Sequence, residues 1–109
     1  MASKRTAYAV IADDLTGAGD AGVQFASAGL QTRTLRGDWM PVHLAGAEVV
    51  VVDTASRGLA PKHAYRRVRA AAERLQEAAA QLIYKKIDST LRGPLGAEID
   101  AVMDACRLP

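Results

Sequence analysis

Three short polar segments, residues 13–17, 53–57 and 86–93, combine carboxylates, hydroxyls and cations, and each begins where an apolar run ends. The first segment opens with the adjacent carboxylates Asp13 and Asp14. Such a pair can act as general base on a hydroxyl, bind the hydroxyls of a ligand, or hold Mg2+. We expect one carboxylate to face a crevice and the other to cap the following turn. The alternative is that both are solvated turn residues.

The first two segments also contain groups suited to an anion. Thr16 and Gly17 stand at the start of a predicted helix, where unpaired N–H groups attract negative charge. Arg57 closes the second segment, and an arginine after a strand can clamp a carboxylate through two parallel hydrogen bonds. The competing interpretation of Arg57 is an ordinary surface arginine.

The third segment is the most informative of the three. Lys85 and Lys86 occupy a predicted strand that should be covered on both faces, and an unpaired buried ammonium group is costly. At least one of these ammonium groups should therefore reach the strand edge or pair with an acid, and Asp88 is the expected partner. The cations of this segment can bind the carboxylate of a ligand, and its oxygen atoms can form hydrogen bonds with the ligand's hydroxyls. The segment is therefore suited to a small polyhydroxy acid. The candidate binding residues of this segment are Lys86, Ile87, Asp88, Ser89 and Arg92.

The apolar pattern predicts the elements that position these segments. Strands are expected over residues 8–12, 32–35, 48–53 and 82–88. Helices are expected over 18–28 and 61–81, with a last helix opened by Pro94 and a loop over 37–46. The four consecutive valines at 49–52 do not alternate, which is typical of a central parallel strand covered on both faces. Gly29 is expected to end the first helix in a left-handed conformation.

This alternation of strands and helices predicts an α/β fold, with a parallel sheet and crossover helices in a Rossmann-like three-layer arrangement. Ligands of open sheets of this kind bind beyond the carboxyl ends of the strands. The three polar segments follow three of the predicted strands, so we expect them to meet at one edge. That convergence is the main reason to predict a binding site.

Composition narrows the class of protein. The chain has 109 residues, half of them hydrophobic, which is the size of one small domain. The single cysteine, Cys106, excludes an internal disulfide, and a buried reduced thiol suits a cytoplasmic protein. No apolar run reaches the roughly 20 residues of a membrane span, and a net charge of +2 is too small to indicate nucleic acid. We therefore expect no membrane and no nucleic acid as partners.

The predicted second helix begins with basic residues. Our hypothesis is that Lys62, His63 and Arg66 give the ligand edge a positive field that attracts acidic substrates. A solvated helix face is the plain alternative. His43 and His63 have no suitably spaced Cys or His partners, so no zinc site is predicted.

The three segments together resemble the signatures of the four-carbon acid sugar kinases. The resemblance lies in residues 11–18 with Asp20, in residues 53–57, and in residues 84–93 followed by Gly96 and Glu98. Pro94 departs from the asparagine that is usual there, and a helix start tolerates this change. The similarity covers nearly the whole chain in three ordered motifs.

This resemblance implies an ATP-dependent kinase of threonate, erythronate or a related acid, with ATP and Mg2+ as cofactors. It implies that Asp13 or Asp14, Arg57 and the run from Lys86 to Ser89 contact the substrate, and that one of the paired aspartates is the catalytic base. Residues 1–109 would be the amino-terminal part of the sugar-acid-binding domain, an incomplete domain without the nucleotide-binding domain and inactive alone. An unpaired sheet edge would then favour self-association, so a homo-oligomer is a further expectation.

Three other interpretations remain open. Residues 16–20 resemble the anion hole of ribokinase-type sugar kinases, although that motif normally lies late in the chain. Asp13, Asp14 and Asp53, with Ser89, imitate the acid pocket of a phosphoacceptor receiver domain, but the expected late strand with its lysine is absent. The third is an interaction module that uses the basic helix, for which salt-dependent binding to nucleic acid would be the sign.

Overall fold

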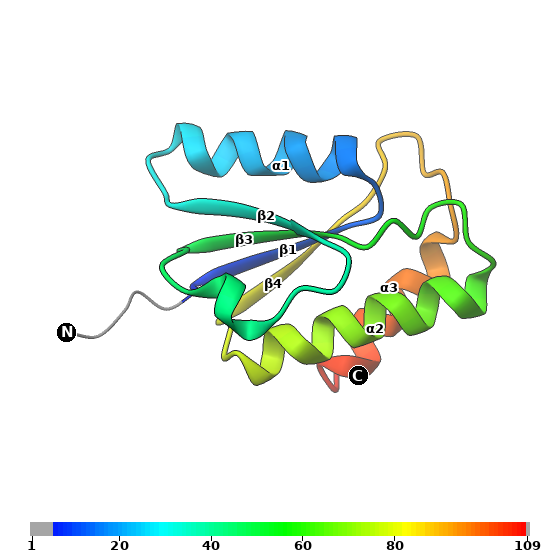
Figure 1. The fold of residues 1–109 in the computed structure, drawn as a ribbon. Helices are drawn as coiled ribbons and strands as arrows, with labels where there is room; N and C mark the ends of the chain where they lie inside the picture. Colours follow the sequence, from blue (N-terminus) through cyan, green and yellow to red (C-terminus); the bar gives the residue numbers. More distant parts are fainter. Residues whose placement is uncertain (1–5, 109) are drawn as a thin grey trace.

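The computed structural model describes residues 6–108, which form a parallel four-stranded sheet between two helical layers (Figure 1). The elements in chain order are β1 (Tyr8–Ala12), α1 (Leu15–Ser27), β2 (Thr32–Arg36), the 3-10 helix η1 (Pro41–Leu44), β3 (Val49–Asp53), α2 (Pro61–Glu77), β4 (Leu82–Lys86) and α3 (Leu95–Ala105). The strand order is β2-β3-β1-β4. Helix α1 covers one face of the sheet, and α2 and α3 cover the other. The predicted α/β class is confirmed.

The core is built on β1 and β3, whose small and β-branched residues pack against both helical layers. Every residue of β3 is buried, as predicted for a central strand. Val50 and Val52 face α2 and α3, whereas Val51 faces α1. Each fully buried valine stabilises the fold by about 1.5–3 kcal/mol relative to an exposed one. The strand ends are therefore held by a well-packed frame.

The strand register brings the polar segments together. Ala12, the last residue of β1, lies opposite Asp53 on β3 and opposite Lys86 on β4. Because all three strands are parallel and end at the same level, the chain leaves each of them at the same edge of the sheet.

Several predicted boundaries differ from the observed ones. Helix α1 begins at Leu15 rather than at Ala18, because the Asp14 carboxylate caps it by accepting the Gly17 N–H at 2.8 Å. Gly29 adopts a φ of 90° after the helix, which confirms the predicted left-handed end.

The second half of the chain shows three further differences. Helix α2 ends at Glu77 rather than at residue 81, because Ala79 takes a left-handed φ of 62°. The predicted loop 37–46 contains the short helix η1, which starts at Pro41. Strand β4 ends at Lys86, so Asp88 belongs to the following loop.

The prediction that the lysine-bearing strand is covered on both faces is wrong. Within residues 6–108, β4 pairs only with β1 and forms an edge of the sheet. Helix α1 packs mainly over β1, β2 and β3, so Leu82 and Tyr84 are 57% and 55% exposed. None of the described helices is both long and apolar enough to cross a membrane.

Candidate functional site

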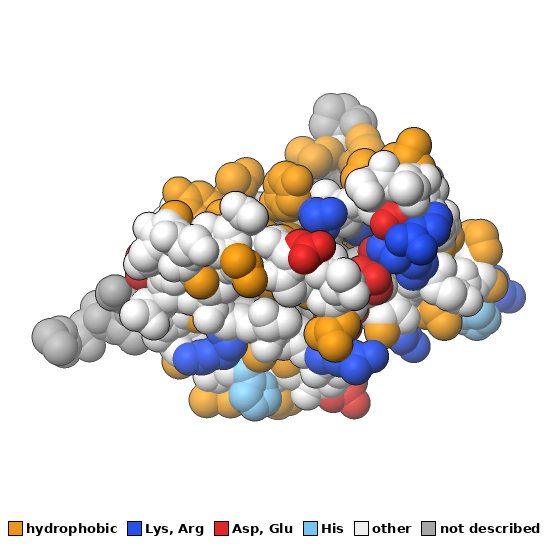
Figure 2. Space-filling view, turned by 90° about the horizontal axis from the view of Figure 1, so that it is seen from above, with side chains coloured by type: hydrophobic (Ala, Val, Ile, Leu, Met, Phe, Trp, Pro, Cys, Tyr) orange, Lys and Arg blue, Asp and Glu red, His pale blue; other side chains and the backbone are white. Residues whose placement is uncertain are grey.

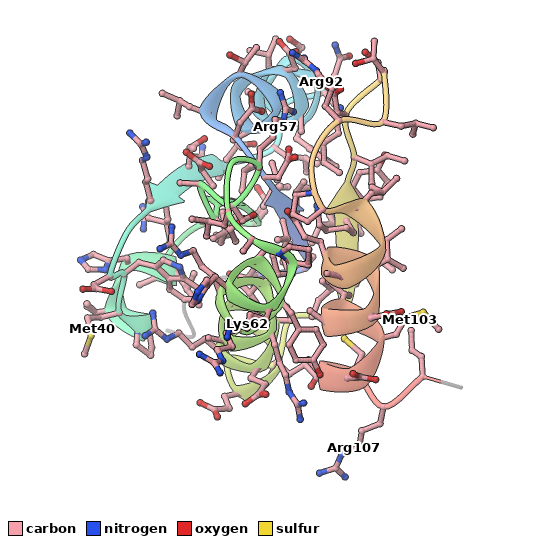
Figure 3. All side chains as sticks on the ribbon, turned by 90° about the vertical axis from the view of Figure 1, so that its right-hand side faces the viewer. Met40, Arg57, Lys62, Arg92, Met103 and Arg107 are labelled. Carbon is pink, nitrogen blue, oxygen red and sulfur yellow. The ribbon has the colours of Figure 1, made fainter. Side chains whose placement is uncertain are left out.

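All ten candidate residues line one cavity of about 290 Å3 at the carboxyl ends of β1, β3 and β4. We call it the Arg57 cavity. Figure 3 shows Arg57 and Arg92 near each other at the top of the view, above the start of α2, where Lys62 is labelled. The cavity residues are Asp13, Asp14, Thr16, Gly17, Arg57, Lys86, Ile87, Asp88, Ser89 and Arg92, together with Asp20.

Arg57 lies at the centre of the cavity and contacts three carboxylates. Its Nε and Nη2 donate to the two oxygens of Asp13, each at 3.0 Å. Its Nη1 lies 3.1 Å from Asp14 Oδ2, and its Nη2 lies 3.3 Å from Asp88 Oδ1. These contacts, above all the hydrogen bond to Asp13, raise the pKa of the Arg57 guanidinium. The arrangement differs from the predicted ligand clamp, because aspartates of the protein already occupy the guanidinium.

The backbone of the loop after β3 explains how Arg57 reaches this position. The N–H groups of Ser56 and Arg57 both donate to the carbonyl of Asp13, at 3.0 and 3.3 Å. Ala55 turns the loop with a left-handed φ of 49°. On the opposite side, Gly93 has a φ of 89°, and a Cβ there would lie 3.1 Å from Arg57 Cγ. Only glycine fits this close approach.

The paired aspartates divide their roles differently from our expectation. Asp14 both caps α1 through Oδ1 and faces the cavity through Oδ2, which contacts Arg57. Its side chain is 29% exposed, compared with 8% for Asp13. Asp13 is therefore buried against Arg57, and Asp14 is the carboxylate that a ligand can reach.

Asp88 is held by its own loop. Arg92 contacts both of its oxygens, through Nε at 2.8 Å and Nη2 at 3.1 Å, and Thr90 Oγ1 donates to it at 2.6 Å. The hydrogen bonds from Arg92 and then Thr90 lower the pKa of Asp88 far below its usual range. A carboxylate held so firmly in its ionised form is a poor general base.

One of the two lysines pairs with an acid, but the prediction that Asp88 is this partner is wrong. Lys85 Nζ lies 3.1 Å from Glu98 Oε1 on α3, on the face of the sheet away from the cavity. Lys86 Nζ donates to the carbonyl of Ile87 at 2.9 Å, and no carboxylate of residues 6–108 lies within ion-pair distance of it. Lys86 is therefore a cation of the cavity without an acidic partner in the described part of the chain.

Sequence reasoning missed the buried network beneath the loop of Arg57. Glu98 is 2% exposed, and its Oε2 accepts a hydrogen bond from Ser56 Oγ at 3.0 Å. Ser56 Oγ in turn lies 2.7 Å from Thr54 Oγ1, which donates to the carbonyl of Ala12. Helical spacing is the signal that points to Glu98, because it lies three and four residues before Ala101 and Val102, which are buried on α3.

Four carboxylates and three cations line the Arg57 cavity. Figure 2 shows acidic and basic side chains side by side at one end of the face covered by α1. The guanidinium of Arg57 occupies the point between Asp13, Asp14 and Asp88, where a metal ion would have to sit. No group of His, Cys, Asp or Glu among the described residues is arranged to hold a metal ion. These residues therefore do not fit Mg2+.

Asp53 lies apart from the other predicted acids. It lines a different cavity from Asp13 and Asp14, and its fully buried carboxylate accepts the Ala55 N–H and contacts Arg36. This separation argues against the acid pocket of a receiver domain.

Comparison with known proteins gives consistent matches over this region. Residues 8–108 match the family model described as a sugar-binding N-terminal domain. D-threonate kinase of Bordetella bronchiseptica is 48% identical over 96 residues, covering 84% of this chain and 24% of the kinase. D-erythronate kinase of Heliobacterium modesticaldum is 46% identical over 97 residues, covering 87% of this chain and 22% of the kinase. The chain thus spans about a quarter of the length of the curated relatives it matches.

Two solved structures from Bordetella bronchiseptica have the same fold. They superimpose with TM-scores of 0.87 and 0.83, at 45% and 46% identity, and cover 94% and 91% of this chain. The alignments span 27% and 26% of those chains, respectively. Both are described as a domain of unknown function with bound citrate, in a domain-swapped dimer.

Proposed function

The chain belongs to the family of sugar-binding N-terminal domains, and from this premise we propose that its Arg57 cavity binds a four-carbon sugar acid such as threonate or erythronate. The observation that carries the proposal is the meeting of cations and carboxylates from three strand ends in one cavity of about 290 Å3. The names of its relatives, D-threonate and D-erythronate kinase, support the choice of ligand.

The charges of the cavity suggest how the ligand is oriented. Lys86 has no acidic partner among residues 6–108, and the Arg92 side chain is 66% exposed, so these two cations receive the ligand carboxylate. Asp14 and Ser89 lie beside them and accept or donate hydrogen bonds to the ligand hydroxyls. Arg57 holds Asp13, Asp14 and Asp88 in place rather than gripping the ligand.

We further propose that this domain serves an ATP-dependent kinase that phosphorylates a hydroxyl of the bound acid. Asp14 is our candidate for the catalytic base, because Asp13 is tied to Arg57 by both oxygens and Asp88 is a weak base. It would accept the proton as the hydroxyl oxygen bonds to the terminal phosphorus of ATP and the bond from that phosphorus to the bridging oxygen breaks, with ADP as the leaving group. The nucleotide and its Mg2+ would be bound by a domain outside residues 1–109, so this chain alone would have no kinase activity. A cytoplasmic location fits this role.

Self-association is part of the same proposal. In residues 6–108 the outer edge of β4 has no partner strand, so it can pair with a strand of another chain, and the exposed Leu82 and Tyr84 lie on the same strand. The domain-swapped dimers of the two solved relatives support a homo-oligomer.

The test is a calorimetric titration of the chain with D-threonate and D-erythronate. We expect saturable binding of at least one acid and none of erythritol, which has the hydroxyls but no carboxylate. Arg92→Gln should weaken binding about tenfold or more, because it removes a charged partner of the carboxylate. Arg107→Gln, an exposed arginine outside the cavity, is the control and should bind as the wild type does. Equal binding of erythritol, or unchanged binding by Arg92→Gln, would refute the proposal.

A further inference from the structure

A second cavity, of about 380 Å3, lies at the ends of β2 and β3, and the loop Asp53–Ala55 is part of its wall. The same loop continues into the Arg57 cavity, but the two cavities share no lining residue. The second cavity is lined by three arginines, Arg36, Arg67 and Arg74, and by two aspartates. We call it the Arg74 cleft. We propose that it binds a small anion with two negatively charged groups, of the diphosphate or dicarboxylate class.

Each arginine of the cleft has a guanidinium nitrogen in contact with an oxygen atom of the protein. Arg67 Nη1 donates to the carbonyls of Thr54 and Ala55, at 3.3 and 3.2 Å. Arg74 Nη1 donates to the carbonyl of Trp39 at 3.3 Å, and its guanidinium carbon lies 5.6 Å from the centre of the Trp39 ring. These contacts use one nitrogen of each guanidinium, so further N–H donors remain for a ligand. Side chains anchored in this way lose little conformational entropy on binding.

The balance of charge in the cleft favours an anion. Arg36 lies 3.2 Å from the buried carboxylate of Asp53, so this pair is neutral. Arg67 and Arg74 have no carboxylate within ion-pair distance in residues 6–108, and Asp38 offsets only one of their charges. A purely structural role, in which Arg67 and Arg74 only donate hydrogen bonds to backbone carbonyls, would not require that both be charged or that both line an open cavity. The lining therefore keeps a net charge of +1, and the guanidiniums of Arg67 and Arg74 can each receive one anionic group of a ligand.

The floor of the cleft leaves space for such a ligand. Ala70 lies on α2 between Arg67 and Arg74, three residues after one and four before the other, so all three side chains share one face of the helix. Ala55 closes the wall with a left-handed φ of 49°, a conformation that costs free energy in any residue with a side chain. This strain is maintained by the Asp53 carboxylate, which accepts the Ala55 N–H at 2.8 Å.

The experiment uses pyrophosphate and orthophosphate as probes and the fluorescence of Trp39, the single tryptophan of the chain, as the readout. Trp39 is in contact with Arg74, so a ligand that draws this guanidinium away should change its emission. We expect a saturable change with pyrophosphate, about tenfold tighter than with orthophosphate. Sodium chloride at the same ionic strength corrects for screening. Amide chemical shifts at Gly37, Ala55 and Ala70 should move in the same titration.

The decisive variant is Ala70→Glu, which places a carboxylate between Arg67 and Arg74 without removing any hydrogen bond. It should abolish the pyrophosphate response, whereas Ala26→Glu, the same change on an exposed position of α1, should preserve it. Ala70→Glu should leave D-threonate binding unchanged, so failure here is distinct from failure of the Arg57 cavity. The inference is overturned if pyrophosphate gives no saturable response, or if Ala70→Glu responds as the wild type does.

Discussion

Glu98 and Lys85 form a buried ion pair beneath the loop that carries Arg57, with Oε1 and Nζ 3.1 Å apart and side chains only 2% and 10% exposed. The other Glu98 oxygen accepts the hydroxyl of Ser56, so one carboxylate joins α3, β4 and the loop after β3. Removal of either charge would leave the other buried without an oppositely charged partner.

We expect Glu98→Leu to lower the free energy of unfolding by about 3–5 kcal/mol, because it strands the Lys85 ammonium in the core. The double variant Glu98→Leu with Lys85→Met should recover most of this loss, since an apolar pair needs no partner. Urea unfolding of both variants measures the difference. Equal free energies of unfolding for the single and double variants would show that leaving Lys85 without its partner carboxylate has no cost.

The Arg57–Asp13 contact is open to a double-mutant cycle. Arg57→Met should destabilise the chain by roughly 1–3 kcal/mol, because three carboxylates lose their shared cation. This range lies below that of fully buried pairs because the Arg57 side chain is 23% exposed. Adding Asp13→Asn should restore part of the stability but not the binding of D-threonate. Calorimetry that shows intact binding by Arg57→Met would contradict the central position given to this arginine.

Asp14 has two separable roles, as helix cap and as a group that faces the ligand. Asn is as good an N-cap as Asp, so Asp14→Asn should unfold at nearly the wild-type urea concentration. Asp14→Ala should lose about 1 kcal/mol of stability. Both variants should lose binding of D-threonate, because neither presents a carboxylate to a hydroxyl. If Asp14→Asn binds as tightly as the wild type, the carboxylate has no part in recognition.

Gly93 and Gly96 make a matched pair for testing the close approach at Arg57. Gly93→Ala forces a side chain into a left-handed conformation and against Arg57, which should cost about 1–2 kcal/mol and weaken ligand binding. Gly96→Ala meets no atom within 4 Å on α3 and should be neutral or stabilising by up to about 1 kcal/mol. Thermal unfolding of both variants checks the contrast. A loss of stability from Gly96→Ala of the same size would show that the contact with Arg57 is irrelevant.

The lowered pKa of Asp88 predicts a stability that depends on pH. The pKa of the unfolded carboxyl lies near its ordinary value of 3.8, and the pKa of the folded one is lower, so the unfolded chain binds the proton first as pH falls. The contribution of Asp88 is therefore complete well above pH 4 and declines below it. The urea midpoint of the wild type should exceed that of Asp88→Asn at pH 6, and the gap should narrow at pH 3. A gap that stays constant over this range would exclude the mechanism.

The convergence of the three polar segments could be predicted because it depends only on strand direction. Asp13 and Arg57 follow the parallel strands β1 and β3, and Lys86 is the last residue of the parallel strand β4. Parallel strands of one sheet bring their ends to one edge. The burial of the β3 valines could also be predicted, because an unbroken apolar run of this length is typical of a parallel strand covered on both faces.

The partners within the site could not be predicted, because they depend on how distant elements dock. Lys85 pairs with Glu98 rather than Asp88 because α3 packs against that face of β4. Arg57 meets Asp13 across 44 positions of sequence, through a turn fixed by backbone hydrogen bonds. The Arg74 cleft exists only because the loop after β2 lies beside α2.

Because Asp14 both caps α1 and faces the cavity, a ligand bound in the cavity would change the hydrogen bond at the start of this helix. Its Oδ1 accepts the Gly17 amide, while its Oδ2 faces the space that a ligand would fill. Any ligand that draws this carboxylate toward itself loosens the first turn of α1, and one that pins it tightens the turn. The rate at which the Gly17 amide exchanges with deuterium therefore reports on the filled or empty state of the cavity from inside the helix.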